Sequence, residues 1–85
     1  MDISRKEQRV LHALAQGGRL VATKAANGKP LHVEGFNRDG WLLPAIGLPL
    51  FRKLLRHKAI ASSNGGPYRI TRRGLELVRS ELDNR

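Results

Sequence analysis

The sequence predicts a single α+β domain over residues 1–85. Three stretches place apolar residues at helical spacing, and two pairs of short β-prone stretches flank turn signals rich in glycine and asparagine. With 40% hydrophobic and 27% charged residues, the composition is that of a globular chain rather than a disordered one. A chain of 85 residues leaves no room for a second independent core.

The first helix is predicted over about residues 5–16. Ser4-Arg5-Lys6-Glu7 fits a capping box, in which the Ser4 hydroxyl accepts from the Glu7 amide and the Glu7 carboxylate accepts from the Ser4 amide. Gly17-Gly18 ends the helix, because glycine tolerates positive φ. The apolar residues that share one face are Ile3, Val10, Leu11 and Leu14.

A hairpin follows the first helix. Residues 19–26 and 30–36 flank Asn27-Gly28, a pair that favours a two-residue type I′ turn. Asn37-Arg38-Asp39-Gly40 is a second turn signal. The short apolar stretch Trp41-Leu42-Leu43 is interpreted as a third strand against this hairpin.

A second helix is predicted over about residues 48–57, with Pro49 in its first turn, where the missing amide costs nothing. Its two faces differ sharply at helical spacing. The inner arc is Leu48, Phe51, Leu54 and Leu55, and the outer arc is Arg52, Lys53, Arg56 and His57.

Residues 59–62 and 68–70 form a second predicted hairpin with a glycine-rich tip at 63–67. Thr71 is then expected to cap a last helix over about residues 72–83. Its predicted inner stripe is Leu75, Val78 and Leu82. Trp41 and Tyr68 are expected to be half-buried anchors of the small core, with stacking on bases as the alternative.

Charge is strongly segregated along the chain. The net charge is +9, and between Trp41 and Gly74 there are seven Lys and Arg residues and not one Asp or Glu. Such a surface acts on nucleic acid, on an anionic membrane surface or on an acidic protein. The alternative is a solvated face that keeps a basic protein soluble. The candidate partner- or nucleic-acid-binding residues are Arg52, Lys53, Arg56, Lys58, Arg69, Arg72 and Arg73.

Other classes of site find little support in the sequence. The chain has no cysteine, and its three histidines lie on different predicted elements without ligand spacing, so we expect no metal. The carboxylates are scattered and no nucleophile has a neighbouring base, so we expect neither an enzyme nor a bound cofactor. No apolar run is long enough to span a bilayer and residues 1–18 are too polar for a secretory signal, which predicts a cytoplasmic protein without a membrane partner.

Residues 48–77 run as basic helix, strand, tight loop, strand, Thr-x-x-Gly and helix. This order resembles the second half of a winged-helix domain, entered through Tyr68-Arg69-Ile70-Thr71-Arg72-Arg73-Gly74. The first half departs from that pattern, because the hairpin at 19–36 stands where another helix normally begins. The resemblance implies a winged-helix-like domain with an extra N-terminal β-hairpin.

The whole chain also resembles the small bacterial YjhX-type proteins. That family includes a toxin that inhibits DNA topoisomerase I and is paired with an acetyltransferase-like antitoxin. The resemblance implies topoisomerase I and an antitoxin protein as partners, but it identifies no interaction residues. It rests on Ser4-Arg5-Lys6-Glu7-Gln8-Arg9, Leu11-His12 with Gly17-Gly18-Arg19, Arg38-Asp39-Gly40 and Leu82-Asp83-Asn84-Arg85.

Two functional hypotheses follow. The first is a small basic inhibitor that binds bacterial DNA topoisomerase I as a protein. The second is a transcriptional regulator that places the helix at 48–57 in the major groove of duplex DNA.

Overall fold

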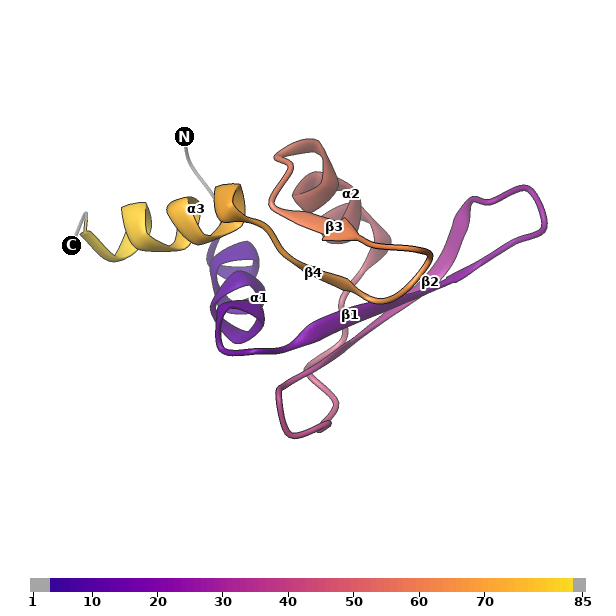
Figure 1. Cartoon of the computed structure of the whole chain (residues 1–85), viewed down its shortest axis with the longest axis horizontal. Coiled ribbons are helices and arrows are strands. Elements are labelled where there is room, and N and C mark those ends of the chain that lie inside the picture. Colours follow the sequence, from indigo (N-terminus) through magenta and orange to yellow (C-terminus); the bar gives the residue numbers. More distant parts are fainter. Residues whose placement is uncertain (1–3, 84–85) are drawn as a thin grey trace.

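The computed structural model describes residues 4–83, and the side chains of residues 4–79. It is a small α+β domain in which three helices pack against a four-stranded antiparallel sheet (Figure 1). The elements in chain order are α1 (Arg5–Ala15), β1 (Arg19–Lys24), β2 (Pro30–Phe36), α2 (Leu48–Arg56), β3 (Ile60–Ser62), β4 (Tyr68–Ile70) and α3 (Arg72–Asp83).

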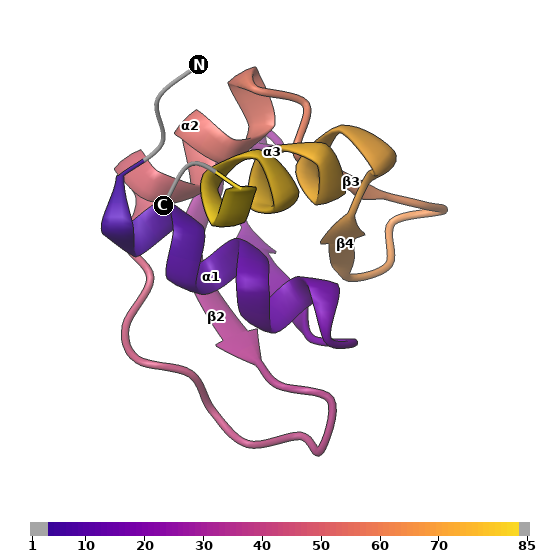
Figure 2. The same cartoon turned by 90° about the vertical axis from the view of Figure 1, so that its left-hand side faces the viewer.

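The sheet has the strand order β2-β1-β4-β3. β1 pairs with β2 from Arg19 opposite Phe36 to Lys24 opposite Pro30, but it pairs with β4 only where Leu20 meets Tyr68. The outer part of the β1–β2 hairpin therefore extends beyond the rest of the sheet (Figure 1). α1 and α3 lie side by side at the other end of the molecule, as both views show (Figures 1 and 2).

The core is formed where the helices meet the inward-facing side chains of the strands. The rings of Phe51 on α2 and Tyr68 on β4 meet edge to face, with centroids 5.0 Å apart. Tyr68 is thus the half-buried anchor that was expected. The buried apolar residues are Leu11, Leu14, Leu20, Val33, Ile46, Phe51, Leu54, Ala59, Ile60, Leu77 and Val78.

Local signals in the sequence located all three helices to within about one residue of their ends. The capping box of α1 is confirmed, since Glu7 N donates to Ser4 Oγ (3.2 Å) and Ser4 N donates to Glu7 Oε1 (2.9 Å). α2 begins after Gly47 with proline in its first turn, as predicted. Ile3, which was assigned to the apolar face of the first helix, lies outside the described residues.

The first hairpin is confirmed, but its predicted type I′ turn is wrong. That turn needs a positive φ at both central residues, and only Gly28 has one. Instead, Ala25 N donates to Lys29 O (2.8 Å) and closes a three-residue loop. Lys29 N also donates to Asn27 Oδ1 (3.0 Å), a local bond that supports the longer loop.

The stretch at 41–43 is not a strand. Its single ladder contact is an isolated bridge between Leu42 and Phe36. Asn37 Oδ1 accepts from the backbone N–H groups of Asp39 and Trp41 (both 2.9 Å), and this turn directs Trp41 away from the hairpin. Trp41 is 72% exposed, so its predicted role as a half-buried anchor is also wrong.

α3 is rotated from its predicted orientation. Leu77 and Val78 are buried, whereas Leu75 is only half-buried, and the side chain of Leu82 lies outside the described part of the chain. The reason is Gly74, where a Cβ would collide with the carbonyl oxygen of Ala59. Its absence lets this side of α3 approach the start of β3, and residues three and four positions later face the same way.

Thr71 joins α3 to the rest of the domain, and its removal should destabilise the protein. Its hydroxyl accepts from Gly74 N (3.0 Å) and donates to Lys58 O (2.6 Å). We expect Thr71→Ala to lower the free energy of unfolding by about 0.5–2 kcal/mol, the usual range for a lost cap. Urea denaturation measures this loss, and Thr71→Ser should keep most of the stability. Equal losses for both variants would contradict a role for the hydroxyl.

Candidate interaction surface

α2 carries the centre of the predicted basic surface, and its orientation decides which cations are exposed. Phe51 and Leu54 are buried in the core, which anchors the helix on one side. Arg52 and Arg56 are exposed on the outer side, one turn apart. They line a shallow depression together with Pro49 and Leu55. We call these four residues the basic face.

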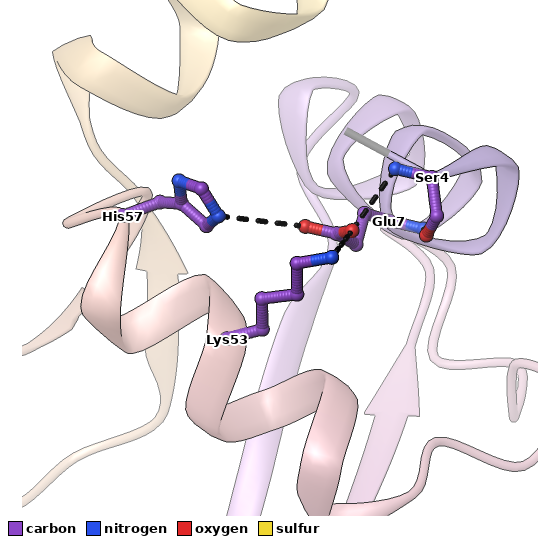
Figure 3. Close-up of polar contacts among 4 residues, drawn as sticks. All are labelled: Ser4, Glu7, Lys53 and His57. Atoms are coloured by element: carbon purple, nitrogen blue, oxygen red, sulfur yellow. Dashed lines mark hydrogen bonds and ion pairs between the residues drawn. The ribbon is translucent and has the colours of Figure 1, made fainter. Parts of the chain in front are cut away.

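Lys53 does not belong to the basic face, contrary to prediction. Its Nζ lies 3.0 Å from Oε1 of Glu7, whose side chain is only 1% exposed (Figure 3). The Glu7 carboxylate on α1 attracts the ammonium group of Lys53, so the lysine side chain lies along the side of α2 that faces α1. Lys53 therefore neutralises a buried acid, although its side chain remains 43% exposed.

Glu7 is a buried charge with a nearly complete set of partners. Burial by itself raises the pKa of this carboxyl, but hydrogen bonds from the Ser4 backbone and from Lys53, and the charge of Lys53, outweigh that effect. The pKa is consequently lowered from its ordinary value of 4.5. The second oxygen, Oε2, faces Nε2 of His57 at 4.0 Å (Figure 3).

The sequence predicted that His57 would lie on the outer arc of α2 with the free cations. Its side chain is instead only 18% exposed, because it closes the same cluster at the end of the helix. Together, Lys53 and His57 cover Glu7 from α2. The cluster fixes one helix against the other, and it accounts for two of the four residues predicted on the outer arc.

The remaining candidate cations lie on neighbouring elements. Lys58, Arg69 and Arg72 are exposed, and no ion pair joins them to an acid within residues 4–79. Lys58 follows α2 with a φ of 57°, and its carbonyl oxygen bonds to Thr71, which brings the end of α2 beside the start of α3. Arg73 is placed differently, because its guanidinium lies 3.6 Å from Glu76.

The seven predicted residues thus fall into three groups. Arg52 and Arg56 share one depression, whereas Lys58, Arg69 and Arg72 are exposed on other parts of the chain and do not line it. Lys53 and Arg73 are paired with acids. Leu55, which the sequence assigned to the core, is 36% exposed and lines the same depression as the two arginines. The signal in the sequence that could have shown this exposure was the position of Leu55 at the edge of the apolar arc of the helix.

The described part of the chain offers no group of three or more His, Asp or Glu side chains that could hold a metal ion. None of the helices in residues 4–83 is both long and apolar enough to cross a membrane.

Comparison with known proteins finds a family that matches the chain over its full length. The family described as "Putative toxin of bacterial toxin-antitoxin pair", YjhX_toxin, matches residues 1–85. The chain belongs to this family. It is 61% identical to the UPF0386 protein of Chelativorans sp. (strain BNC1) and 62% identical to a UPF0386 protein of Rhizobium etli (strain ATCC 51251), in both cases over 85 residues and 100% of each chain.

A further YjhX_toxin relative, a UPF0386 protein of Mesorhizobium japonicum, is 63% identical over 78 residues, which are 92% of this chain and 79% of that protein. No solved structure matches the chain. The family description names one half of a toxin–antitoxin pair, which points to an antitoxin as the partner.

The Glu7 cluster predicts a specific acid sensitivity. Because the folded-state pKa is lowered, the ionised carboxylate stabilises the fold above the unfolded value, and this contribution is lost as the pH falls below about 4.5 through the folded pKa. We expect Glu7→Gln to lower stability at neutral pH by about 1.5–3 kcal/mol, the range for hydrogen bonds to charged groups. It should also flatten the loss of stability in acid.

Denaturation curves over a series of pH values measure both effects. Glu34→Gln is the matched control, because the Glu34 carboxylate is half-exposed and lies 3.9 Å from the imidazole ring of His32 rather than in contact with a lysine. An acid profile that is as steep in Glu7→Gln as in the parent protein would contradict the role given to Glu7.

Proposed function

We propose that this protein is the toxin of a toxin–antitoxin pair and that it inhibits bacterial DNA topoisomerase I by binding the enzyme through the basic face. Membership of the YjhX_toxin family over the whole chain supports the toxin role. The target comes from the resemblance carried by the sequence motifs. The proposal describes a non-catalytic inhibitor that acts in the bacterial cytoplasm.

The observation that carries protein binding is the mixed character of the basic face. Leu55, 36% exposed, lies with Pro49 in the same depression as Arg52 and Arg56. An apolar centre with arginines around it suits a protein surface that offers both acids and apolar groups, because arginine contacts through its planar fork and its alkyl stem. A purely phosphate-binding surface needs only the cations.

A second candidate function is DNA binding by a winged-helix-like domain. The arrangement β1-β4-β3, with α2 directly before the β3–β4 hairpin, supports this interpretation. In such domains the helix that precedes the hairpin enters the major groove, and in this interpretation Arg52 and Arg56 would contact bases or phosphates there. The β1–β2 hairpin is then an addition to the usual arrangement.

Order of addition separates the two functions. We expect the purified protein to slow the relaxation of supercoiled plasmid by a bacterial type I topoisomerase, and to inhibit more after pre-incubation with the enzyme than with DNA. An enzyme binder titrates against enzyme at constant DNA, whereas a DNA binder tracks DNA and weakens steeply with salt. Unaffected relaxation together with a shifted DNA band at low salt would favour the regulator.

Reversing the charges on the basic face tests which residues carry the proposed inhibition. We expect Arg52→Glu with Arg56→Glu to weaken inhibition about tenfold or more, equivalent to about 1.4 kcal/mol, without unfolding the protein. Lys53 is left intact because it supports Glu7. Lys29→Glu with Arg38→Glu is the matched control, since both side chains are exposed on turns and the charge change is the same. Equal effects of the two double substitutions would show that the basic face acts only through the net charge of the protein.

A further inference from the structure

Residues 41–45 form an exposed apolar segment that neither the core nor the basic face uses. Trp41 is 72% exposed and Leu42 is 62% exposed, and Pro44 and Ala45 are also exposed. The loop between β2 and α2 that contains them arches away from the body of the domain (Figure 2). We call residues 41–45 the apolar ridge. Contiguous exposed apolar side chains of this size mark interaction sites in soluble proteins.

The apolar ridge is held by backbone hydrogen bonds at Trp41 and at Leu43. Asn37 N donates to Trp41 O (2.9 Å), and Asn37 Oδ1 accepts from Trp41 N (2.9 Å). Leu43 N then donates to Gly35 O (2.8 Å) on the outer edge of β2. At Gly35, a Cβ would lie 2.5 Å from the side chain of buried Ile46, so glycine is what lets this loop pack down. A segment ordered in advance loses little entropy when a partner binds.

A groove runs between the apolar ridge and α1. Its floor and walls are mainly apolar and include Val10, Leu43, Pro44 and Leu50. Lys6 and Arg9 add two cations on its α1 side, and they are three residues apart on one side of that helix. We call this hollow the ridge groove. Its lining contains no Asp or Glu.

The charge around the ridge groove identifies the kind of occupant. Lys6 and Arg9 are exposed, and no ion pair joins either of them to an acid among residues 4–79. The occupant must therefore supply carboxylates beside apolar side chains. A second copy of this chain fits poorly, because it also carries a net charge of +9.

We propose that the ridge groove binds an acidic, amphipathic segment of another protein, with its apolar side chains against Leu43 and Leu50 and its carboxylates on Lys6 and Arg9. A concave apolar strip with cations on one side is the arrangement that receives an amphipathic helix. Trp41 does not line the groove, but it is exposed two residues before Leu43 on the apolar ridge. A bound segment that continues past Leu43 would meet it there, and tryptophan is over-represented among the side chains that dominate binding energy.

This site is separate from the basic face. Leu50 lines the ridge groove and Arg52 lines the other depression, and two residues apart on a helix they point about 200° apart. The two surfaces can therefore be occupied at the same time. The inference does not depend on whether the basic face binds topoisomerase or DNA. Its test uses synthetic peptides and needs neither topoisomerase nor DNA.

Trp41 is the single tryptophan of the chain and reports directly on the apolar ridge. The probe is a synthetic amphipathic helix with leucines on one face and glutamates beside them, and the matched probe carries lysine in place of each glutamate. We expect the acidic peptide to shift Trp41 emission to the blue and to protect it from acrylamide. Calorimetry should show the acidic peptide binding about tenfold or more tightly than the basic peptide.

Variants assign the binding to its residues. K6E with R9E should reverse the preference between the two peptides, and W41A should weaken binding of the acidic peptide about tenfold. R52E with R56E should leave both results unchanged, because these residues lie on the other side of α2. Loss of binding in all the charge variants alike would overturn the site in favour of general electrostatic attraction.

Other occupants give different results, and each overturns the proposal. Vesicles of phosphatidylglycerol that shift Trp41 emission where the acidic peptide does not would identify a membrane-binding loop. A blue shift that appears with protein concentration alone, together with a doubled mass in solution, would identify a second copy. Absence of any response to the acidic peptide would also reject the proposed occupant.

Discussion

The buried carboxylate of Glu7 is the constraint on which the arrangement of the helices depends. A fully buried charge is tolerated only when paired and hydrogen-bonded. Here the partners come from two elements, since Ser4 belongs to the start of α1 and Lys53 and His57 belong to α2. The carboxylate therefore determines both where α1 begins and how α2 is rotated about its axis. With Lys53 turned toward α1, Arg52 and Arg56 are left outermost.

α2 consequently serves four environments with nine residues. Phe51 and Leu54 fill the core, Lys53 covers Glu7, and Arg52 and Arg56 face solvent. Leu50 reaches the ridge groove on yet another side. A short helix used on every side has little freedom to rotate, because any rotation that improves one contact breaks another. The two proposed binding surfaces are thus held in a constant relation by the same element.

Local chemistry explains what the sequence could and could not predict. The caps formed by Ser4 and Thr71 and the helix start at Gly47 depend on neighbours within a few residues, and these were predicted correctly. The position of Lys53 depends on Glu7, a residue far away in the chain that the capping box already explained. No periodicity argument could show that the same carboxylate would also attract a lysine of α2.

At the candidate surfaces, too, features that depend on neighbouring residues were predicted and features that depend on distant contacts were not. Arg52 and Arg56 were found from helical spacing and charge, and both are exposed. Trp41 was misplaced because an apolar run after a turn also fits an edge strand, and its exposure depends on the bonds that Asn37 makes to the loop backbone. Similarly, the rotation of α3 depends on the close approach of Gly74 to Ala59, which the Thr-x-x-Gly pattern does not reveal by itself.

Charge also limits how such a protein could inhibit a topoisomerase. Surfaces that bind DNA are positive, and a chain of net charge +9 is repelled from them rather than attracted. Competition for the DNA channel is therefore the least favourable mode for this protein. For the proposed target, an acidic patch outside that channel would satisfy Arg52 and Arg56 and accept Leu55 beside them, and it would leave DNA bound while the enzyme is inhibited. Electrostatics and the apolar centre of the basic face thus favour the same mode, in which inhibitor and DNA occupy the enzyme together.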